Sequence, residues 1–554
     1  MRFLKAAALA AAVAALLLAV TVFATLRNGV AAIAFVPAAV VAIADLLDVQ
    51  NLQLVPEPHF DSPEGALRLT YGVASGDVTA TTAEVWARAS GPSEVIVEFW
   101  DETAGEVAAR SVHTGAIPER DHAVIFRLEG LAPNAAHAFR VWAEGTDSDG
   151  RAEQSPPMVG RFRTAPDPSI RRDTSFVFSG DLGGGGYCRR ADSGYAIFDA
   201  MRELEPDFFI ALGDMIYADN TCPATNPVGE ATVPGGFRSV SSRAVDWTSY
   251  ERVREVYFQH WRYNRADERF QAFLSQTPMY VLWDDHEIVN DSGASWAHAN
   301  VTSANRVGYA TLAAAARDAL FAYNPIARDP TEPNRLYRHV SWGADLDLFL
   351  LDTRSYRSRN DLADTPDNQK AMLGREQLQW LKSGLAQSRA TWKVVATSVP
   401  LSIPTGGIAA ALYGRDAWAN GTSWDYSSQT GFERELLDLL GFGDATGVQN
   451  VVFLSGDAHQ AVEIRYSADL DGGGRPFLFH EIVAGPLSAP AVRSEPQLDP
   501  TLNPTMLYRE AGFFNFGYIR IERSGDGLAH LIADVRGVDG QPRPGSRLDL
   551  TPAP

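Results

Sequence analysis

The alternation of apolar and polar positions divides the chain into regions of different character. Between about 66 and 165, short apolar runs alternate with polar residues and are separated by Gly, Pro, Asp and Asn turns. Strands at such regular spacing predict a small all-β sandwich, which we expect to be of fibronectin type III or immunoglobulin type. The clearest runs are AEVWARAS (83–90), EVIVEFWDE (94–102), HAVIFRLEG (122–130) and AHAFRVWAEG (136–145).

From about 174 the pattern changes to fully apolar runs that alternate with segments of helical periodicity. This alternation predicts an α/β (α+β) domain with layered β-sheets flanked by helices. Late apolar segments at 476–489, 513–523 and 528–537 are expected to be strands that complete a second sheet. The other strand-like runs lie at 174–181, 206–214, 278–285, 345–355, 392–400 and 448–460, and the helical ones at 194–205, 249–264, 374–388 and 433–441.

The first residues of the chain are strongly apolar. Arg2 and Lys5 precede an uninterrupted apolar run at 6–24, and a second apolar run follows at 30–44. The first run is long enough to cross a bilayer as a helix and long for the core of a signal peptide. We therefore expect residues 1–48 to be a signal peptide or a transmembrane anchor. The remainder would be periplasmic or extracellular, with the membrane as a partner of the N-terminal segment.

Length and changes in composition set the expected domain boundaries. A chain of 554 residues is too long for one compact core. Polar, Pro-containing linkers precede the sandwich and separate it from the α/β region. The expected organisation is a leader or anchor at 1–48, a linker at 49–65, a β-sandwich at 66–165, an α/β domain at 172–540 and a tail at 541–554.

The net charge of −20 limits the classes of partner. A surface that grips nucleic acid needs stripes of basic residues, so we expect no such grip. A small phosphate-bearing molecule remains compatible with this charge, because bound metal cations can reverse the local field. The composition gives no oligomeric state.

The chain has two cysteines, Cys188 and Cys222. In an exported protein two cysteines pair more often than they stay free. Each lies a few residues past a strand-like run, so the two loops could meet and form a disulfide. Two independent thiols, or one thiolate that binds a metal, are the alternatives.

Candidate metal ligands follow several of the apolar runs. Asp181 ends the first run, Asp214 ends the second with Tyr217 close behind, and Asp457 and His459 follow a late run. Open α/β sheets place their sites at the carboxyl ends of strands. Each residue alone is more often a turn or cap residue than a ligand. Their recurrence after successive strands predicts a metal site.

The densest charge lies in the stretch VLWDDHEIVND (281–291). Its charged run at 284–287 follows an apolar strand directly, and burying that much charge is costly unless something compensates for it. A metal is the compensation that fits the neighbouring motifs. We expect Asp285 to be a ligand, and Asp284 and Glu287 to orient the residues that touch the metal or the substrate.

These motifs resemble those of the calcineurin-like metallophosphoesterases, and more closely those of the PhoD-type alkaline phosphatases, which share a site plan with purple acid phosphatases. The resemblance covers about 66–535 and includes RLTYGVASGDVTATTAEVWAR, which is similar to the N-terminal domain of that family. The motifs that carry it are SGD at Asp181, GDMIY at Asp214–Tyr217, WDDHE around Asp285, VATSVP at 395–400 and GDAH at Asp457–His459.

Three departures from the wider superfamily pattern bear on the metals. Asp285 stands where the superfamily has Asn, and Asp457 replaces the first His of the last motif. Both forms occur in the PhoD-like branch, so they support that resemblance. Ser398 lies near the place of an expected His ligand.

The donor types divide the ligands into two clusters. Asp181, Asp214, Tyr217 and His459 would form the first, and phenolate suits Fe(III). Asp214, as a bridge, would join Asp285 and Asp457 in the second. Its oxygen donors favour Ca²⁺, Mg²⁺ or Mn²⁺ over Zn²⁺. The resemblance implies iron with calcium in a dinuclear or larger site.

The resemblance also implies hydrolysis of phosphate monoesters or diesters by a metal-activated hydroxide, with phospholipid head groups and nucleotides among the possible substrates. His286 would protonate the leaving oxygen or position the phosphate, unless it is a structural histidine bonded to Asp284. Arg354 would bind phosphate or form a surface salt bridge. Asn264 and Asn290 are weaker candidates for contacts to the metal or to its ligands.

A cell-surface binding or adhesion protein with an inert phosphatase-like domain is the alternative function. The complete set of candidate ligands argues against an inert site. A serine hydrolase is disfavoured, because the sequence has no G-x-S-x-G elbow.

Overall fold

The computed structural model describes the chain from residue 66 to residue 553, with short gaps. The segments expected as leader or anchor (1–48) and linker (49–65) lie outside the described residues. Among the helices that are described, none is long and apolar enough to cross a membrane. The gaps are 107–108, 148, 241–248, 294–307, 368, 406–413 and 420–430.

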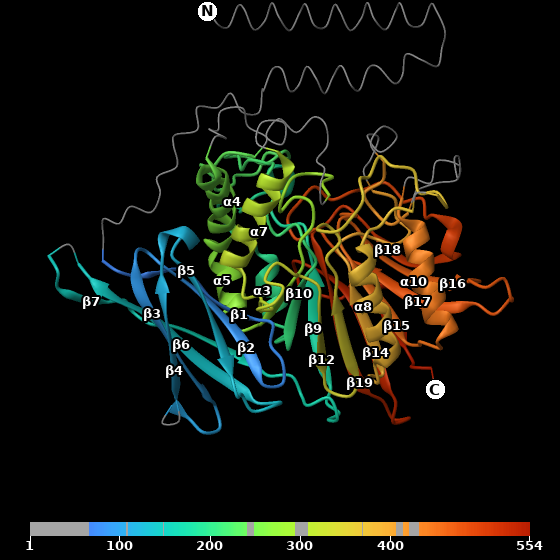
Figure 1. Ribbon diagram of the computed structural model, residues 1–554, viewed down its shortest axis with the longest axis horizontal. Helices are drawn as coiled ribbons and strands as arrows, with labels where there is room; N and C mark the ends of the chain where they lie inside the picture. Colours follow the sequence, from blue (N-terminus) through green and yellow to red (C-terminus); the bar gives the residue numbers. More distant parts are fainter. Residues whose placement is uncertain are drawn as a thin grey trace, which may run out of the picture.

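Two large mixed sheets form the centre of the molecule (Figure 1). The nine-stranded sheet has the order β21-β20-β19-β9-β10-β11-β1-β2-β5, and the seven-stranded sheet the order β12-β13-β14-β15-β17-β16-β18. The strands of the first are β1 (Leu69–Gly76), β2 (Thr82–Ala89), β5 (Ala123–Glu129), β9 (Thr174–Ser179), β10 (Phe208–Ala211), β11 (Met279–Val281), β19 (Asn515–Arg523), β20 (Ala529–Gly537) and β21 (Leu548–Leu550). Those of the second are β12 (Arg338–Trp342), β13 (Leu346–Leu350), β14 (Trp392–Ala396), β15 (Val451–Ser455), β16 (Ala461–Ala468), β17 (Phe477–Val483) and β18 (Pro504–Glu510).

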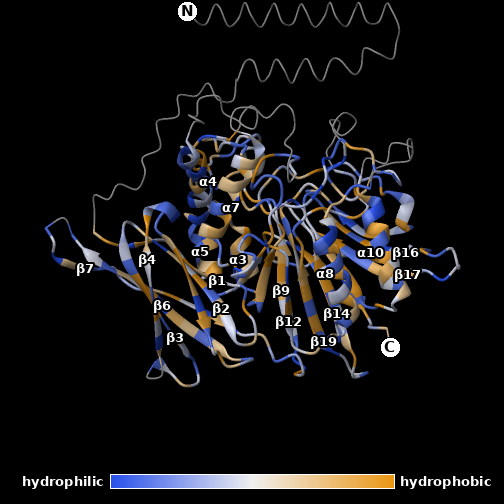
Figure 2. Ribbon diagram, viewed as in Figure 1, coloured by the Kyte–Doolittle hydropathy of each residue, from blue (hydrophilic) through white to orange (hydrophobic). Residues whose placement is uncertain are grey.

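One of the hydrophobic cores lies between these two sheets. It contains Phe176 and Ile210 from the nine-stranded sheet, and Leu348 and Val394 from the seven-stranded sheet. Because the other faces are also covered, the central strands are apolar on both sides and do not alternate. Figure 2 shows this as hydrophobic colour along the central strands, with hydrophilic colour in the peripheral loops.

Helices cover the outer faces of both sheets. One group packs with Val177 and Phe209 on the nine-stranded sheet, and the other packs with Val395 and Phe453 on the seven-stranded sheet. The first group is α3 (Ile197–Arg202), α4 (Tyr250–Arg265), α5 (Glu268–Leu274) and α7 (Tyr309–Tyr323), and the second is α8 (Gly374–Gln387) and α10 (Glu433–Ala445). Short 3₁₀ helices are η2 (Pro118–Arg120), η3 (Gly184–Gly186) and η4 (Pro500–Leu502).

The region 66–165 forms two β layers around their own core. A five-stranded sheet packs against β1, β2 and β5, which belong to the nine-stranded sheet. β1 pairs in parallel with β11 through Gly76 and Met279, so the main sheet continues into this region. The five-stranded sheet consists of β3 (Ser93–Asp101), β4 (Arg110–Ala116), β6 (Ala136–Thr146), β7 (Ala152–Gln154) and β8 (Met158–Arg163).

Several details of the fold differ from the sequence-based expectation. The late strands β19 and β20 do not complete the second sheet, because β19 pairs with β9 in the first. Helix α7 was not expected, since its alanine-rich sequence is apolar on several faces and lacks a clear amphipathic stripe. The helix at 194–205 is also shorter than expected, because α3 spans only Ile197–Arg202.

The junction between β1 and β11 gives a stability prediction. A Cβ on Gly76 would lie 2.5 Å from the carbonyl oxygen of Met279, which is backbone and cannot rotate away. We expect Gly76→Ala to destabilise the protein by about 1–3 kcal/mol, measured by denaturant unfolding. Gly91→Ala, whose Cβ would meet nothing within 4 Å, is the control. Equal stability of the two variants would contradict this account of the junction.

Candidate metal centre

The candidate ligands lie in turns at the carboxyl ends of β9, β10, β11 and β15. Asp181, Asp214, Asp457 and His459 all have backbone φ angles in the left-handed region, at 64°, 53°, 61° and 52°. Such conformations are uncommon for residues other than glycine and gather at functional sites. The turns therefore direct these side chains to one place at a cost in backbone energy.

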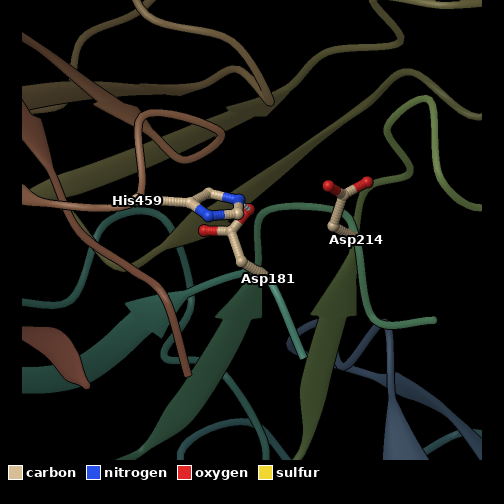
Figure 3. A group of neighbouring side chains, drawn as sticks. All are labelled: Asp181, Asp214 and His459. Carbon is tan, nitrogen blue, oxygen red and sulfur yellow. Dashed lines mark ion pairs between the residues drawn. The ribbon is translucent and has the colours of Figure 1, made fainter. Parts of the chain in front are cut away.

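The first cluster brings together the residues that the sequence assigned to it. Asp181, Asp214 and His459 each offer a ligand atom within 4.8 Å of the others, and Figure 3 shows them converging. Nε2 of His459 lies 3.0 Å from the Tyr217 hydroxyl and 3.4 Å from Asp181. Nδ1 of His459 donates to the carbonyl of Pro490 at 2.7 Å, which leaves Nε2 free to bind a metal.

The second cluster is larger than expected. Asp214 and Asp285 lie together with His286, but Asp457 groups with Asp284 and Asp416 instead. A further group is formed by Asp285, Asp291 and Asp416. Asp416 was missed because no apolar strand precedes it and no motif marks it. Asp291 ends the stretch that drew attention in the sequence, but it had no assigned role.

Some oxygens of the buried carboxylates in these clusters have no partner among the described residues. One oxygen each of Asp181, Asp214, Asp284 and Asp457 is buried without a hydrogen bond among the described residues. Burial, with the neighbouring carboxylates of Asp285 and Asp284, raises the pKa of Asp214 well above its ordinary value, although His286 opposes this. Bound cations would supply the missing partners and remove the repulsion. The donors present therefore fit a metal centre.

His286 is held by Asp219, a residue that the sequence interpretation missed. Nδ1 of His286 lies 2.7 Å from Oδ1 of Asp219, so the expected alternative, a bond to Asp284, is wrong. Burial alone would lower the pKa of His286, but Asp219 and the carboxylates at the metal centre raise it well above its ordinary value. The imidazole packs on the ring of Tyr217, with centroids 4.0 Å apart. Its position beside the ligands suits proton donation.

Glu287 and Asp284 hold the turns around the site. The carboxylate of Glu287 accepts backbone N–H bonds from Asp214, Met215 and Asp284 at 2.6–2.9 Å. Burial raises the pKa of Glu287 to about 8. Asp284 accepts from Ser398 at 2.6 Å, so the residue near the expected His position supports a carboxylate.

Arg354 is placed differently from the expectation of a phosphate-binding or surface residue. Its side chain is fully buried, and Nε donates to Asp284 at 2.6 Å. Its two terminal nitrogens bind both oxygens of Asp416, at 2.8 and 2.5 Å, and one of them also reaches the carbonyl of Ser292. The guanidinium of Arg354 thus binds the carboxylates of Asp284 and Asp416. This corrects its assignment as a substrate-binding group.

The two asparagines differ in position. Asn264 donates to the carbonyl of Met215 at 2.7 Å and accepts from the hydroxyl of Tyr195, so it ties α4 to the turn after Asp214. Asn290 is exposed, and its side chain bonds Asp291. Both side chains are therefore bonded to protein groups, Asn264 to a carbonyl and a hydroxyl and Asn290 to a carboxylate.

The two cysteines are joined. Cys188 and Cys222 form a disulfide, with Cα atoms 5.7 Å apart. This pairing excludes the alternatives of independent thiols or a thiolate ligand in the structure.

Sequence comparisons find a family that matches most of the chain. The family profile described as "PhoD-like phosphatase" matches residues 182–529, and its companion, described as "PhoD-like phosphatase, N-terminal domain", matches residues 55–166. The chain is 27% identical over 416 residues to "Alkaline phosphatase D" of Bacillus subtilis (strain 168). That match covers 70% of this chain and 64% of the relative, less than two thirds of its length.

Structural comparisons give the same fold. The structure entitled "Structure of PhoD" matches with a TM-score of 0.62 at 22% identity, over 87% of this chain and 92% of that one. A purple acid phosphatase from yellow lupin (Lupinus luteus) matches with a TM-score of 0.54 at 14% identity, over 87% and 74%. The layered mixed sheets are thus shared with both.

The geometry predicts which substitution empties the centre. Asp214 takes part in two of the ligand groups, so Asp214→Asn should lower the metal retained after dialysis by about tenfold or more. Asn290→Ala, beside the site but outside the ligand groups, should retain metal like the parent. Elemental analysis per mole of protein measures both. Full metal retention in Asp214→Asn would remove this residue from the ligand set.

Proposed function

Because the chain belongs to the PhoD-like phosphatase family, we propose that it is a metal-dependent phosphoesterase that hydrolyses phosphate monoesters or diesters. One observation carries the proposal. One buried carboxylate oxygen each of Asp181 and Asp214, which lie beside His459, and of Asp284 and Asp457, which lie together with Asp416, has no partner among the described residues. Such a cluster is costly in a protein core unless cations occupy it.

Two kinds of donor support two kinds of cation. Asp181, Asp214, Tyr217 and His459 would hold Fe(III), since phenolate is a good ligand for it. The carboxylates around Asp285 would hold Ca²⁺, with Mn²⁺, Mg²⁺ or Zn²⁺ as alternatives. Bound there, the cations would supply a nucleophilic hydroxide and neutralise charge on the phosphoryl oxygens.

Side chains of the protein donate a proton to the leaving group and hold the carboxylates of the site in position. His286, oriented by Asp219, protonates the oxygen of the leaving group. Arg354 keeps Asp284 and Asp416 in place, since it binds both. This division of roles is supported by burial, because Arg354 is closed off from solvent while the side chain of His286 keeps 15% of its surface exposed.

Two features of the chain bear on where the protein is located. The apolar run at 6–24 and the disulfide support export to the periplasm or cell exterior, with the chain secreted or membrane-anchored. Phospholipid head groups and nucleotides are included in the proposed substrate class. The convergence of every ligand motif argues against the alternative of an inert phosphatase-like domain in an adhesion protein.

The central test pairs metal analysis with two substrates. We expect the purified protein to contain metal and to hydrolyse a nitrophenyl phosphate monoester or a bis-nitrophenyl diester. A chelator should abolish turnover, and added metal should restore it. A protein that holds no metal and shows no chelator-sensitive turnover of either ester would overturn the proposal.

A second test concerns the proton donor. A poor leaving group needs protonation and nitrophenolate does not, so His286→Ala should lower kcat for an alkyl phosphate by about 10²–10⁴-fold and much less for nitrophenyl phosphate. Asp219→Asn should shift the ratio in the same direction while metal content stays unchanged. The exposed Asp192→Asn is the control. Equal losses on both substrates, or loss of metal from His286→Ala, would contradict the assignment.

A further inference from the structure

A run of four glycines, residues 183–186, passes directly over Tyr217. A Cβ built on Gly184 would lie 2.5 Å from both Cε1 and Cζ of the Tyr217 ring. Real Cβ atoms do not approach carbon so closely, and Gly184 itself does not have a left-handed φ. The requirement for glycine here is therefore space for the phenol ring.

The ring that Gly184 contacts is also confined by two histidines. The imidazole of His286 packs on it at 4.0 Å between centroids, and Nε2 of His459 lies 3.0 Å from its hydroxyl. Tyr217 is buried, with 5% of its surface exposed. The direction of its hydroxyl thus depends on how closely the glycine turn approaches.

The glycine turn is tied to the rest of the site on both sides. The N–H of Gly183 donates to the carbonyl of Ser488 at 2.6 Å, and the N–H of Ser488 donates to the carbonyl of Asp181 at 3.0 Å. The N–H of Gly185 donates to Oδ1 of Asn220 at 2.9 Å. These bonds connect the turn to Asp181 and to the segment that follows Tyr217.

The disulfide joins the glycine turn covalently to the segment that follows Tyr217. Cys188 lies two residues after the glycine run, and Cys222 lies five residues after Tyr217. Cys188 is buried, and both sulfurs pack in a cluster with Phe237 and Tyr263. The two segments that bear Gly184 and Tyr217 therefore cannot separate while the disulfide is intact.

We propose that Gly184 and the Cys188–Cys222 disulfide are positioning elements that hold the Tyr217 hydroxyl beside Asp181, Asp214 and His459, so that an intact disulfide is a condition for tight metal binding at this cluster. The proposal rests on the proposed metallophosphoesterase function. Reduction of the disulfide takes two electrons and two protons from a dithiol, which becomes a disulfide itself. Reduction lets the segments that bear Gly184 and Tyr217 move apart, so the Tyr217 hydroxyl is no longer held in one position.

The first experiment adds one carbon to the turn. Parent, Gly184→Ala and Gly115→Ala proteins are loaded with ferric iron, and iron content and the visible charge-transfer absorption of a phenolate bound to Fe(III) are measured. Tyr217→Phe identifies the band. We expect Gly184→Ala to shift or lose the band and to retain iron at least about tenfold more weakly. Gly115→Ala, with open space around its Cβ, should match the parent.

The second experiment does not depend on whether Gly184→Ala folds. The folded parent protein is treated with a dithiol, and the Cys188→Ser, Cys222→Ser double variant is left untreated. Both should show the same weakened iron retention and altered band, with the circular dichroism spectrum of the parent. The untreated parent is the reference.

The outcomes separate this proposal from the one on which it rests. A parent with chelator-sensitive turnover, and a Gly184→Ala or reduced protein with unaltered band and iron content, would overturn the positioning role alone. A parent that turns over but lacks the band would remove Tyr217 from the ligands and would also overturn it. A parent with neither metal nor turnover would overturn the proposed function itself.

Discussion

Concentrated, buried negative charge is the constraint on which the rest of this structure depends. Moving a carboxylate out of water costs several kcal/mol, and this site gathers many of them within a few ångströms of one another. The chain compensates part of this charge itself, since Arg354 and Arg357 both form ion pairs with the carboxylate of Asp416 and Arg354 also binds Asp284. One oxygen each of Asp181, Asp214, Asp284 and Asp457 remains for cations.

The layered sheets make this concentration possible. β9, β10 and β11 bring their turns from one sheet, and β15 brings Asp457 and His459 from the other. A metal held between the two sheets would contact both of them. Its binding site exists only in the folded chain. Its binding would therefore add to stability through mass action. The left-handed backbone at four ligand positions is tolerated because the surrounding hydrogen bonds, such as those to Glu287, determine the turns.

Particular residues show how far sequence reasoning reached. The first cluster was predictable, because Asp181, Asp214 and His459 each follow an apolar run and strand ends meet at one edge of a sheet. Asp219 and Asp416 carried no such signal, since one lies inside a turn and the other in a loop. Arg354 was expected to bind phosphate or to form a surface salt bridge, and its burial against Asp284 and Asp416 contradicts both, because residue type alone does not show whether an arginine faces solvent.

The sequence by itself determined the central strands that carry the ligands, the order of the ligand motifs and the donor chemistry, because periodicity and residue type are local properties. Only the tertiary structure decided which carboxylates lie close enough to share a cation, which carboxylate orients His286 and why Gly184 must be small. Those answers depend on distances between segments far apart in the chain. Pairings such as Tyr217 with His459, separated by 242 positions, arise from the packing of the two sheets and leave no local pattern.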